Sequence, residues 1–441
     1  MQPATEEEEE MELLMTDNQQ LQLLGQGTYG CAFYPEINCK THHITQSSRN
    51  YLSKIHFQDD SSKREMDIGQ RIVKRVPNYR YFFAPIVESC PVQLASLRQN
   101  KIKQCNVLTN ATLSNRQIMS SKVPYLGKLT LDKYFNSLFQ NQYCGRLRSN
   151  TRCVNMTVTY IKKLINSYLY LITSFQKLNA DVGVVHLDVK SDNIMYDTKH
   201  HLPILIDFGM SYCIDWLQLP AYLSFKYPFG VQSFSYSPWC LEVCLLTHLA
   251  RHGRPKHQTM NSHGGYIDEA LLKTITPPEL LETYSSLCAD FVKSNINHHV
   301  FTEAERQTLQ SNLQNWIVRL GQNKTLESLW TSLLTSHRTW DLYAVAMMYL
   351  YEMEDSGLLN LYPSGSTELQ ATPVRQFLNQ LKRVILAVPD QRPNGKQMFQ
   401  DARALFAKMT LTNYQQITSS NMQQRAQARR KANRALLLNQ N

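Results

Sequence analysis

Two short apolar runs joined by a polar turn constrain the fold of this chain more than any other feature. Residues 194–196 and 202–206 are apolar, and residues 197–201 between them are polar. Short apolar runs separated by turn residues predict a β-hairpin. Because the two strands of a hairpin run back along each other, Asn193 before the first strand should lie beside Asp207 after the second.

Side chains suited to phosphoryl transfer flank this hairpin. The run His-Leu-Asp-Val-Lys-Ser-Asp-Asn occupies residues 186–193, and an Asp-Phe-Gly run begins at Asp207. Asp188 can accept a hydroxyl proton, and Lys190 can neutralise a moving phosphate. Asn193 and Asp207 can hold metal ions. The alternative is a buried hairpin whose polar ends have no chemical role.

A glycine-rich motif, Gly-Gln-Gly-Thr-Tyr-Gly, stands at residues 25–30 between apolar runs at 21–24 and 31–34. A motif of this form is a weak signal on its own. A dinucleotide-binding fold would need a helix directly after the glycines and an acidic residue about twenty positions later. Here a strand-like run follows and ends at Pro35, which favours a strand-turn-strand flap.

Apolar periodicity predicts the other elements of the chain. Residues 156–178 carry so broad an apolar surface that we expect a buried helix. Further strands are predicted at residues 51–57, at 82–87 and within 118–127, and further helices at 63–74, 129–139 and within 277–330.

In this order, the glycine motif, Lys54, the 186–193 run and Asp-Phe-Gly resemble the motifs of eukaryotic-type serine/threonine protein kinases. The resemblance covers roughly residues 21–407. It implies an α+β, bilobal protein-kinase-like fold with a small antiparallel β N-lobe bearing one helix, and a larger, mainly helical C-lobe carrying an inserted helical segment. The expected parts are a disordered acidic N-terminus (1–18), an N-lobe with insertions (19–126), a C-lobe (127–410) with the insertion at about 250–338, and a basic tail (411–441).

The resemblance also implies roles for individual residues. Asp188 and Lys190 are the expected catalytic residues, and Asn193 and Asp207 the expected metal ligands. Lys54 would position the α- and β-phosphates of ATP with Glu65 as its partner, for which Glu88 is the alternative. The implied cofactors are ATP and Mg²⁺, with Mn²⁺ as a second candidate metal. The full expected ATP-binding set is Gly25, Gln26, Gly27, Thr28, Tyr29, Gly30, Cys31, Ala32, Lys54 and Glu65.

Three further residues match kinase positions that support the fold rather than the chemistry. Asp341, in a Trp-Asp-Leu-Tyr-Ala run, resembles the aspartate that fixes the catalytic-loop backbone. Glu242 stands where kinases have the Glu of Ala-Pro-Glu, and Arg392 resembles its buried partner. The main departure from the family is the long stretch between residues 249 and 338, which we interpret as an inserted helical subdomain.

Two positions narrow the kind of kinase that the chain resembles. Lys190, two residues after Asp188, is typical of serine/threonine protein kinases rather than of small-molecule or tyrosine kinases. Leu187 replaces the Arg that normally reads a phosphate on the activation segment, which implies activity without that phosphate. The Gly-x-Gly-x-Tyr-Gly-Cys motif and the insertions are similar to the divergent kinases of large DNA viruses.

The net charge of +10 is concentrated toward the C-terminus, because the first twelve residues hold six glutamates and no acidic residue follows Asp401. The basic tail could contact nucleic acid weakly or bind an import receptor, and a solvated helix end is the simpler interpretation. We expect protein substrates with Ser or Thr acceptors and no membrane association. An intracellular, soluble location follows: host-cell cytoplasm or virion for a viral protein, with the nucleus as an alternative.

The ten cysteines are scattered along the sequence without closely spaced pairs. Because the N-terminal residues do not resemble a signal peptide, we expect reduced, buried thiols.

Two other functions stay open at this point. The chain could be a catalytically weak pseudokinase that acts as a scaffold, although Lys54, Asp188, Asn193 and Asp207 are all present. It could also be a nucleic-acid-associated protein that acts through its basic tail.

Overall fold

The computed structural model of the chain describes residues 22–27, 30–37, 39, 49–92, 105–106, 117–140, 151–218, 236, 238–252, 273–276, 278–296, 299–322, 324–356, 358–361 and 372–409. The chain is a mixed α+β protein that divides into two compact units. Unit 1 comprises Met1–Val73 and Ala84–Lys128, and unit 2 comprises Lys74–Phe83 and Leu129–Asn441. The predicted boundary after residue 126 falls near the division at Lys128. The acidic N-terminus and the basic tail lie outside the described residues.

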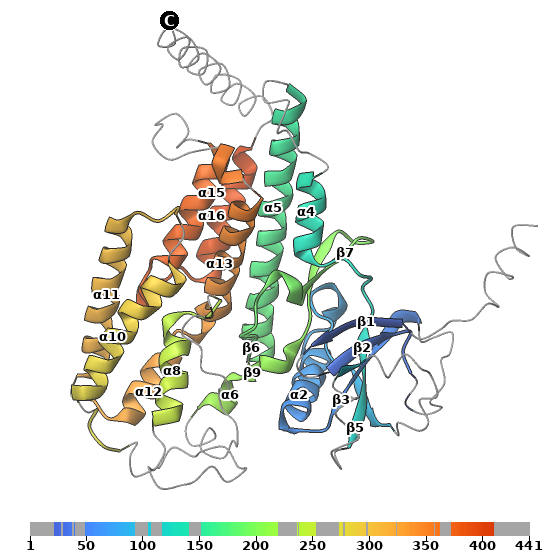
Figure 1. Cartoon of the computed structure of the whole chain (residues 1–441), viewed down its shortest axis with the longest axis horizontal. Coiled ribbons are helices and arrows are strands. Elements are labelled where there is room, and N and C mark those ends of the chain that lie inside the picture. Colours follow the sequence, from blue (N-terminus) through green and yellow to red (C-terminus); the bar gives the residue numbers. More distant parts are fainter. Residues whose placement is uncertain are drawn as a thin grey trace, which may run out of the picture. The chain divides into compact units, whose positions relative to one another are not determined.

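Unit 1 is built on an antiparallel sheet of five strands in the order β1-β2-β3-β5-β4 (Figure 1). The strands are β1 (Gln22–Gly27), β2 (Gly30–Tyr34), β3 (Tyr51–Phe57), β4 (Glu88–Pro91) and β5 (Ile118–Pro124). Ala32 of β2 and Ser121 of β5 flank Lys54 of β3 in the register. Phe33 and Ile55 are fully buried in the core. The predicted strands at the glycine motif and at 51–57 are therefore confirmed, and the strand expected within 118–127 is present as β5, which ends at Pro124.

The helix of unit 1, α2 (Asp60–Arg75), buries Glu65, Ile68, Gly69 and Ile72 on one face. Gly69 allows close packing, because a Cβ at this position would come within 2.1 Å of the Ile86 carbonyl oxygen. The strand predicted at residues 82–87 is wrong. A 3₁₀ turn (η2, Tyr79–Tyr81) precedes this segment, and the strand begins only at Glu88. Pro85 lacks the N–H that a ladder needs, and the Ile86 carbonyl faces the helix.

Two disulfides cross unit 1, so the expectation of reduced thiols is wrong for four of the cysteines. Cys31 pairs with Cys105, and Cys39 pairs with Cys90. The partners are 74 and 51 residues apart in the sequence. Such pairs have no local spacing signal, because only the folded sheet brings them together. Cys213, Cys240, Cys244 and Cys288 are buried and lie outside the two disulfides, as expected.

Unit 2 is organised around the long helix α5 (Thr151–Lys177), which packs against α13 (Trp340–Asp355), α15 (Pro373–Ile385) and α16 (Gly395–Lys408) (Figure 1). Edge-on contacts join the Tyr168 ring to Tyr349 and Phe377, each at 5.1 Å between ring centroids. A π-helical turn (η6, Leu178–Val182) follows α5. Gly183 ends it with a φ of 75°, a left-handed conformation that suits glycine. The predicted buried helix is confirmed.

The predicted hairpin is present as β7 (Ile194–Asp197) and β8 (Leu202–Leu205), with Ile194 opposite Leu205. Helix α4 (Leu131–Gln140) precedes α5. The short elements that flank the hairpin along the chain are β6 (Val184–Val185), η7 (Ser191–Asn193), η8 (Phe208–Met210), β9 (Tyr212–Cys213) and α6 (Ile214–Leu217). Strand β6 pairs with β9, so the segment before the hairpin and the segment after it are joined directly.

The stretch predicted as an inserted helical subdomain contains helices where the structure describes it. These are α8 (Leu241–His252), α10 (Pro278–Asn295), α11 (Glu303–Gly321) and α12 (Leu326–Leu334), and α10 packs along α11 (Figure 1). A capping box between Thr302 and Glu305 begins α11. The indole N–H of Trp330 donates to the Leu217 carbonyl at 3.0 Å, which ties α12 to the segment after the hairpin. The 3₁₀ turns of this half are η9 (His337–Thr339), η10 (Leu358–Leu361) and η11 (Pro389–Gln391).

Among the described residues, no helix has the length and apolar character to cross a membrane.

Reduction should reveal the two disulfides. In denatured, unreduced protein, thiol labelling should count four fewer cysteines than after reduction, since four are paired. Replacing Cys39 and Cys90 together by Ser should lower the free energy of unfolding by about 2–4 kcal/mol, because the unfolded chain regains the entropy of an open loop. Equal thiol counts before and after reduction would show that the cysteines are not paired.

Glu352 should make stability depend on pH. Burial raises the pKa of this carboxyl to about 7, against the opposing hydrogen bond from Tyr160. The native state therefore binds more protons than the unfolded chain between pH 4.5 and about 7. The free energy of unfolding should fall as the pH rises through this range, by up to about 3 kcal/mol. Urea unfolding at several pH values should show a flatter profile for Glu352→Gln, while the exposed control Glu279→Gln keeps the wild-type slope. An unchanged slope in Glu352→Gln would contradict this assignment.

Candidate functional site

The loop before the hairpin is anchored by the carboxylate of Asp341, in the first turn of α13. Its Oδ2 accepts the His186 N–H at 2.8 Å, and its Oδ1 accepts the Leu187 N–H at 3.0 Å. Burial raises the pKa of Asp341, and the hydrogen bonds from these two N–H donors oppose that rise. The prediction that Asp341 fixes this backbone is confirmed.

Leu187 lies in a conformation that leucine rarely adopts. Its φ is 62°, and its side chain is buried. For an L-residue with a Cβ this left-handed region costs about 1–2 kcal/mol. Asp341 holds the Leu187 N–H, and the indole N–H of Trp239 donates to the Leu187 carbonyl at 2.7 Å. Both peptide groups of the strained residue are therefore fixed from outside the loop.

The carboxylate of Asp188 is the centre of the hydrogen bonds in this loop. Lys190 Nζ lies 3.2 Å from Oδ1 and 3.0 Å from Oδ2. Asn193 Nδ2 donates to Oδ2 at 2.6 Å and to the Asp188 carbonyl at 2.9 Å. The hydroxyl of Tyr236 donates to Oδ1. Only 10% of the Asp188 side chain is exposed, whereas 43% of the Lys190 side chain is. The two expected catalytic residues thus lie together, and the amine reaches the surface.

His186 links this loop to the second strand of the hairpin. Its Nε2 lies 3.0 Å from the Ile206 carbonyl, which requires a proton on Nε2. Nδ1 can then accept the Asp188 N–H at 3.3 Å. The Ser211 hydroxyl donates to the His186 carbonyl at 3.1 Å. His186 is a structural residue here: its bonds connect the backbone of the loop with that around Asp207.

Asn193 and Asp207 lie side by side at the open end of the hairpin, as predicted. The Ile206 N–H donates to the Asn193 carbonyl at 3.0 Å, one residue before Asp207. Asp207 has a φ of 59°, which aspartate tolerates better than most residues, and it is exposed. Because Asn193 uses its amide nitrogen on Asp188, its Oδ1 is the atom suited to a metal.

The oxygen donors of Asn193 and Asp207 fit a hard cation such as Mg²⁺. This ion usually takes one or two protein oxygens and completes its shell with phosphates and water. In the described part of the chain, no three His, Cys, Asp or Glu residues are placed to form a metal centre of their own. The pair would therefore hold Mg²⁺ together with a phosphate-bearing ligand.

In unit 1, Lys54 and Glu65 form the predicted ion pair. Lys54 Nζ lies 2.8 Å from Oε1 and 2.9 Å from Oε2 of Glu65. The pair is largely buried, with 19% of the Lys54 side chain and 9% of the Glu65 side chain exposed. Glu88, the alternative partner for Lys54, instead lies near Lys122. The distance between Glu88 Oε2 and Lys122 Nζ is 3.9 Å, so this ion pair is weak. The pair holds Lys54 in one position on β3.

The glycine motif forms the β1–β2 hairpin, with Gly27 opposite Gly30. A Cβ on Gly30 would lie 2.6 Å from the Ile55 carbonyl oxygen, so the glycine allows β2 to approach β3. Among the described residues, a Cβ on Gly25 or Gly27 would meet no atom within 4 Å, so these residues leave the surroundings of both glycines open. Thr28 and Tyr29 lie outside the described residues.

The remaining expected nucleotide-binding residues differ in what they contact. Ala32 lies opposite Lys54 in the sheet. Gln26 accepts a hydrogen bond from the Asn106 N–H at 3.2 Å. Cys31 is 1% exposed and bonded to Cys105, so its side chain belongs to the core. Any contact of Cys31 with a nucleotide would have to use its backbone.

Glu242 and Arg392 form the predicted buried pair. Arg392 donates to both carboxylate oxygens at 2.9 Å, and Ser336 and Thr339 supply further partners. Burial alone would raise the pKa of Glu242, but the guanidinium outweighs it and lowers that pKa. The guanidinium also stacks over the Tyr343 ring, 5.1 Å from its centroid. The pair joins α8, the start of α13 and the segment before α16.

Sequence reasoning missed three residues of this site: Tyr236, Trp239 and Ser211. Each contacts the 186–193 loop through a hydrogen bond to Asp188, to Leu187 or to His186. Ser211 and Tyr236 fall in a stretch rich in Ser and aromatic residues, where no spacing distinguishes one from its neighbours. Trp239 stands directly before the three residues that align with Ala-Pro-Glu, of which only Glu242 matches the family pattern.

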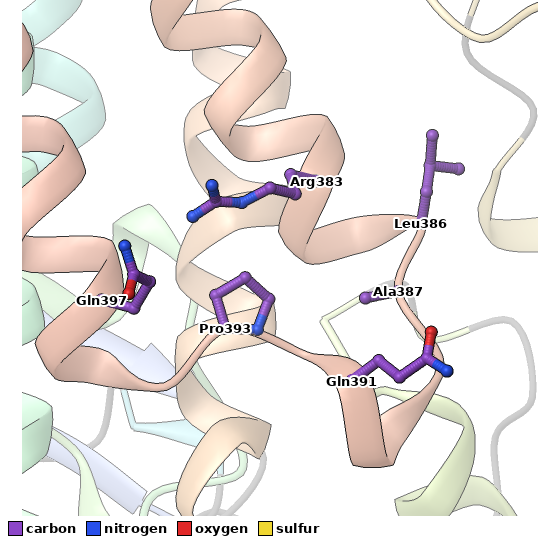
Figure 2. A pocket seen from close by; sticks show the side chains of 6 residues that line it. All are labelled: Arg383, Leu386, Ala387, Gln391, Pro393 and Gln397. Carbon is purple, nitrogen blue, oxygen red and sulfur yellow. The ribbon is translucent and has the colours of Figure 1, made fainter.

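An open pocket of about 540 Å³ lies elsewhere on unit 2 (Figure 2). It is formed where α15 ends, by the following turn, and by the start of α16. Its lining residues are Arg383, Leu386, Ala387, Gln391, Pro393 and Gln397. The Arg383 guanidinium is paired with Asp401, so its charge is already balanced. None of the residues expected to carry phosphoryl transfer lines this pocket.

No protein-family model matches this chain, and a search of curated proteins finds no significant match.

Breaking the Glu242–Arg392 pair should destabilise the fold. Glu242→Gln would leave a buried guanidinium without its counter-charge, so the free energy of unfolding should fall by about 3–5 kcal/mol. Chemical unfolding measures this change, and Glu279→Gln on the surface of α10 is the matched control, expected within about 0.5 kcal/mol of wild type. A loss below about 1 kcal/mol would mean that the pair is not buried as described.

Proposed function

We propose that this protein is an ATP-dependent serine/threonine protein kinase, which transfers the γ-phosphate of ATP to Ser or Thr hydroxyls of proteins. One observation carries the proposal. The carboxylate of Asp188 is bonded to both Lys190 and Asn193, in a loop whose backbone Asp341 holds. This arrangement puts a carboxylate, an amine and a side-chain amide on one short segment beside Asp207, and these groups could act as proton acceptor, cation and metal ligand.

Asp188 would orient the acceptor hydroxyl and take its proton as the new P–O bond forms, while the bond between the γ-phosphorus and the β–γ bridging oxygen breaks and ADP leaves. Lys190, exposed and bonded to both Asp188 oxygens, would offset negative charge on the phosphoryl group as it moves. Asn193 Oδ1 and the Asp207 carboxylate would hold Mg²⁺, with Mn²⁺ as a second candidate metal. When bound, the metal ion supplies charge neutralisation on the phosphates of ATP.

Unit 1 would supply the groups that hold the nucleotide. Lys54 is kept in place by Glu65 and would bind the α- and β-phosphates as a fixed positive charge. The open surroundings of Gly25 and Gly27 would let backbone N–H groups approach phosphate oxygens. Since kinases do little covalent chemistry of their own, the fixed positions of these groups are the main contribution of the protein.

Lys190 favours Ser and Thr over Tyr as the acceptor, on the resemblance to serine/threonine kinases. Activity without a phosphate on the activation segment, the similarity to kinases of large DNA viruses, and an intracellular location remain predictions of the sequence. A role for the basic tail in contacting nucleic acid or an import receptor is likewise untested.

Phosphate transfer from labelled ATP to generic protein substrates tests the proposal. With Mg²⁺ present, the full chain should label Ser and Thr, and chelation of the metal should stop the reaction. Asp188→Ala and Asp207→Ala should each lower the rate by at least about 100-fold, because each removes a group needed in the transition state. Asp181→Ala is the matched control, since Asp181 is an exposed residue whose nearest ion-pair partner is Lys177.

Undiminished transfer by Asp207→Ala would refute the proposed roles. No transfer by the unmodified chain, with nucleotide binding retained, would favour the pseudokinase alternative. Phosphotyrosine as the main product would overturn the choice of acceptor.

A further inference from the structure

The hydroxyl of Tyr236 is bonded to the carboxylate of Asp188. In the proposed function, the hydroxyl of the substrate would bond to this same carboxylate. The Tyr236 hydroxyl donates to Oδ1 of Asp188. Burial and the neighbouring Asp188 hold the pKa of this phenol above its usual value. The phenol therefore stays protonated at neutral pH and remains a donor.

With Tyr236 bound, the Asp188 carboxylate has its hydrogen-bonding positions filled. Lys190 bonds to both oxygens, Asn193 bonds to Oδ2, and Tyr236 bonds to Oδ1. An ionised carboxylate accepts about four hydrogen bonds. A substrate hydroxyl must donate to this same carboxylate, so it has no free position while the Tyr236 bond exists.

Further contacts tie Tyr236 to the loop that carries Asp188. Its ring packs edge-on against Trp239, 5.5 Å between centroids, and its carbonyl accepts the Trp239 N–H at 2.9 Å. The Trp239 indole in turn donates to the Leu187 carbonyl. Of the side chains that bond to Asp188, Lys190 and Asn193 belong to its own loop. Tyr236 comes from a different segment, 48 residues further along the chain.

We propose that Tyr236 is an internal occupant of the acceptor position, which a protein substrate must displace before its hydroxyl can reach Asp188. The inference rests on the proposed kinase function. An occupant of this kind competes with the protein substrate and not with ATP. It therefore raises the KM for the protein substrate, and it leaves kcat at saturating substrate and the KM for ATP unchanged.

Tyr236→Phe removes one oxygen atom and keeps the ring that packs on Trp239. A hydrogen bond to a charged group corresponds to a factor of about ten or more in an equilibrium. The KM for a peptide substrate should therefore fall about tenfold, with kcat and the KM for ATP as in wild type. Tyr81→Phe is the matched control, because Tyr81 is an exposed tyrosine of the same unit, whose ring packs edge-on against His200. It should leave all three constants unchanged.

The alternative is that Tyr236 orients Asp188 for catalysis, and the split between KM and kcat separates the two roles. If Tyr236→Phe lowers kcat, or leaves the peptide KM unchanged, the inference is overturned while the proposed function stands. If neither wild type nor Tyr236→Phe transfers phosphate to any substrate, the proposed function fails and the inference fails with it. Thermal unfolding of Tyr236→Phe close to that of wild type confirms that the variant is folded.

Discussion

Two hydrogen bonds that one buried carboxylate accepts hold the candidate site in place. Asp341 accepts the N–H groups of His186 and Leu187, directly before Asp188. These bonds hold Leu187 in a left-handed conformation that its side chain disfavours. Without them, the backbone would relax toward an ordinary conformation, and Asp188 would lose its position relative to Lys190 and Asn193. A strained residue persists only where its surroundings hold it from several sides.

The buried charges of unit 2 form a supporting layer around this loop. Glu242 and Arg392 neutralise each other, and Ser336 and Thr339 bond to the pair directly before α13, the helix that carries Asp341. Trp239, close to Glu242 in the sequence, reaches the Leu187 carbonyl. The pair is thus connected to the site through the start of α13 and through the turn before α8. Its role is structural, since neither charge is exposed to a ligand.

The elements that could be predicted best from the sequence are those that local patterns determine. The hairpin that joins Asn193 to Asp207, the helix that carries Glu65, and the strand that carries Lys54 follow from apolar periodicity and turn residues. The Lys54–Glu65, Glu242–Arg392 and Asp341 contacts followed from motif order rather than from physics. The function itself rests on that same resemblance.

Predictions failed where the outcome depends on contacts between distant segments. The disulfides join cysteines 74 and 51 residues apart, and the spacing of cysteines shows neither. The segment before Glu88 looked like a strand because it is apolar, but Pro85 and the packing of Ile86 on Gly69 prevent a ladder. Tyr236 meets Asp188 across 48 residues, and a tyrosine in a stretch rich in aromatics has no distinguishing pattern.

The proposed phosphoryl transfer would require Lys54 and Asp207 to act on the same nucleotide. Calorimetric titration of wild type, Lys54→Met and Asp207→Asn with ATP, with and without Mg²⁺, tests this requirement directly. The account predicts that wild type binds ATP with Mg²⁺, that both variants bind it more weakly, and that the effect of Asp207→Asn disappears without the metal. Failure of wild type to bind ATP, or wild-type affinity in either variant with Mg²⁺ present, would contradict it.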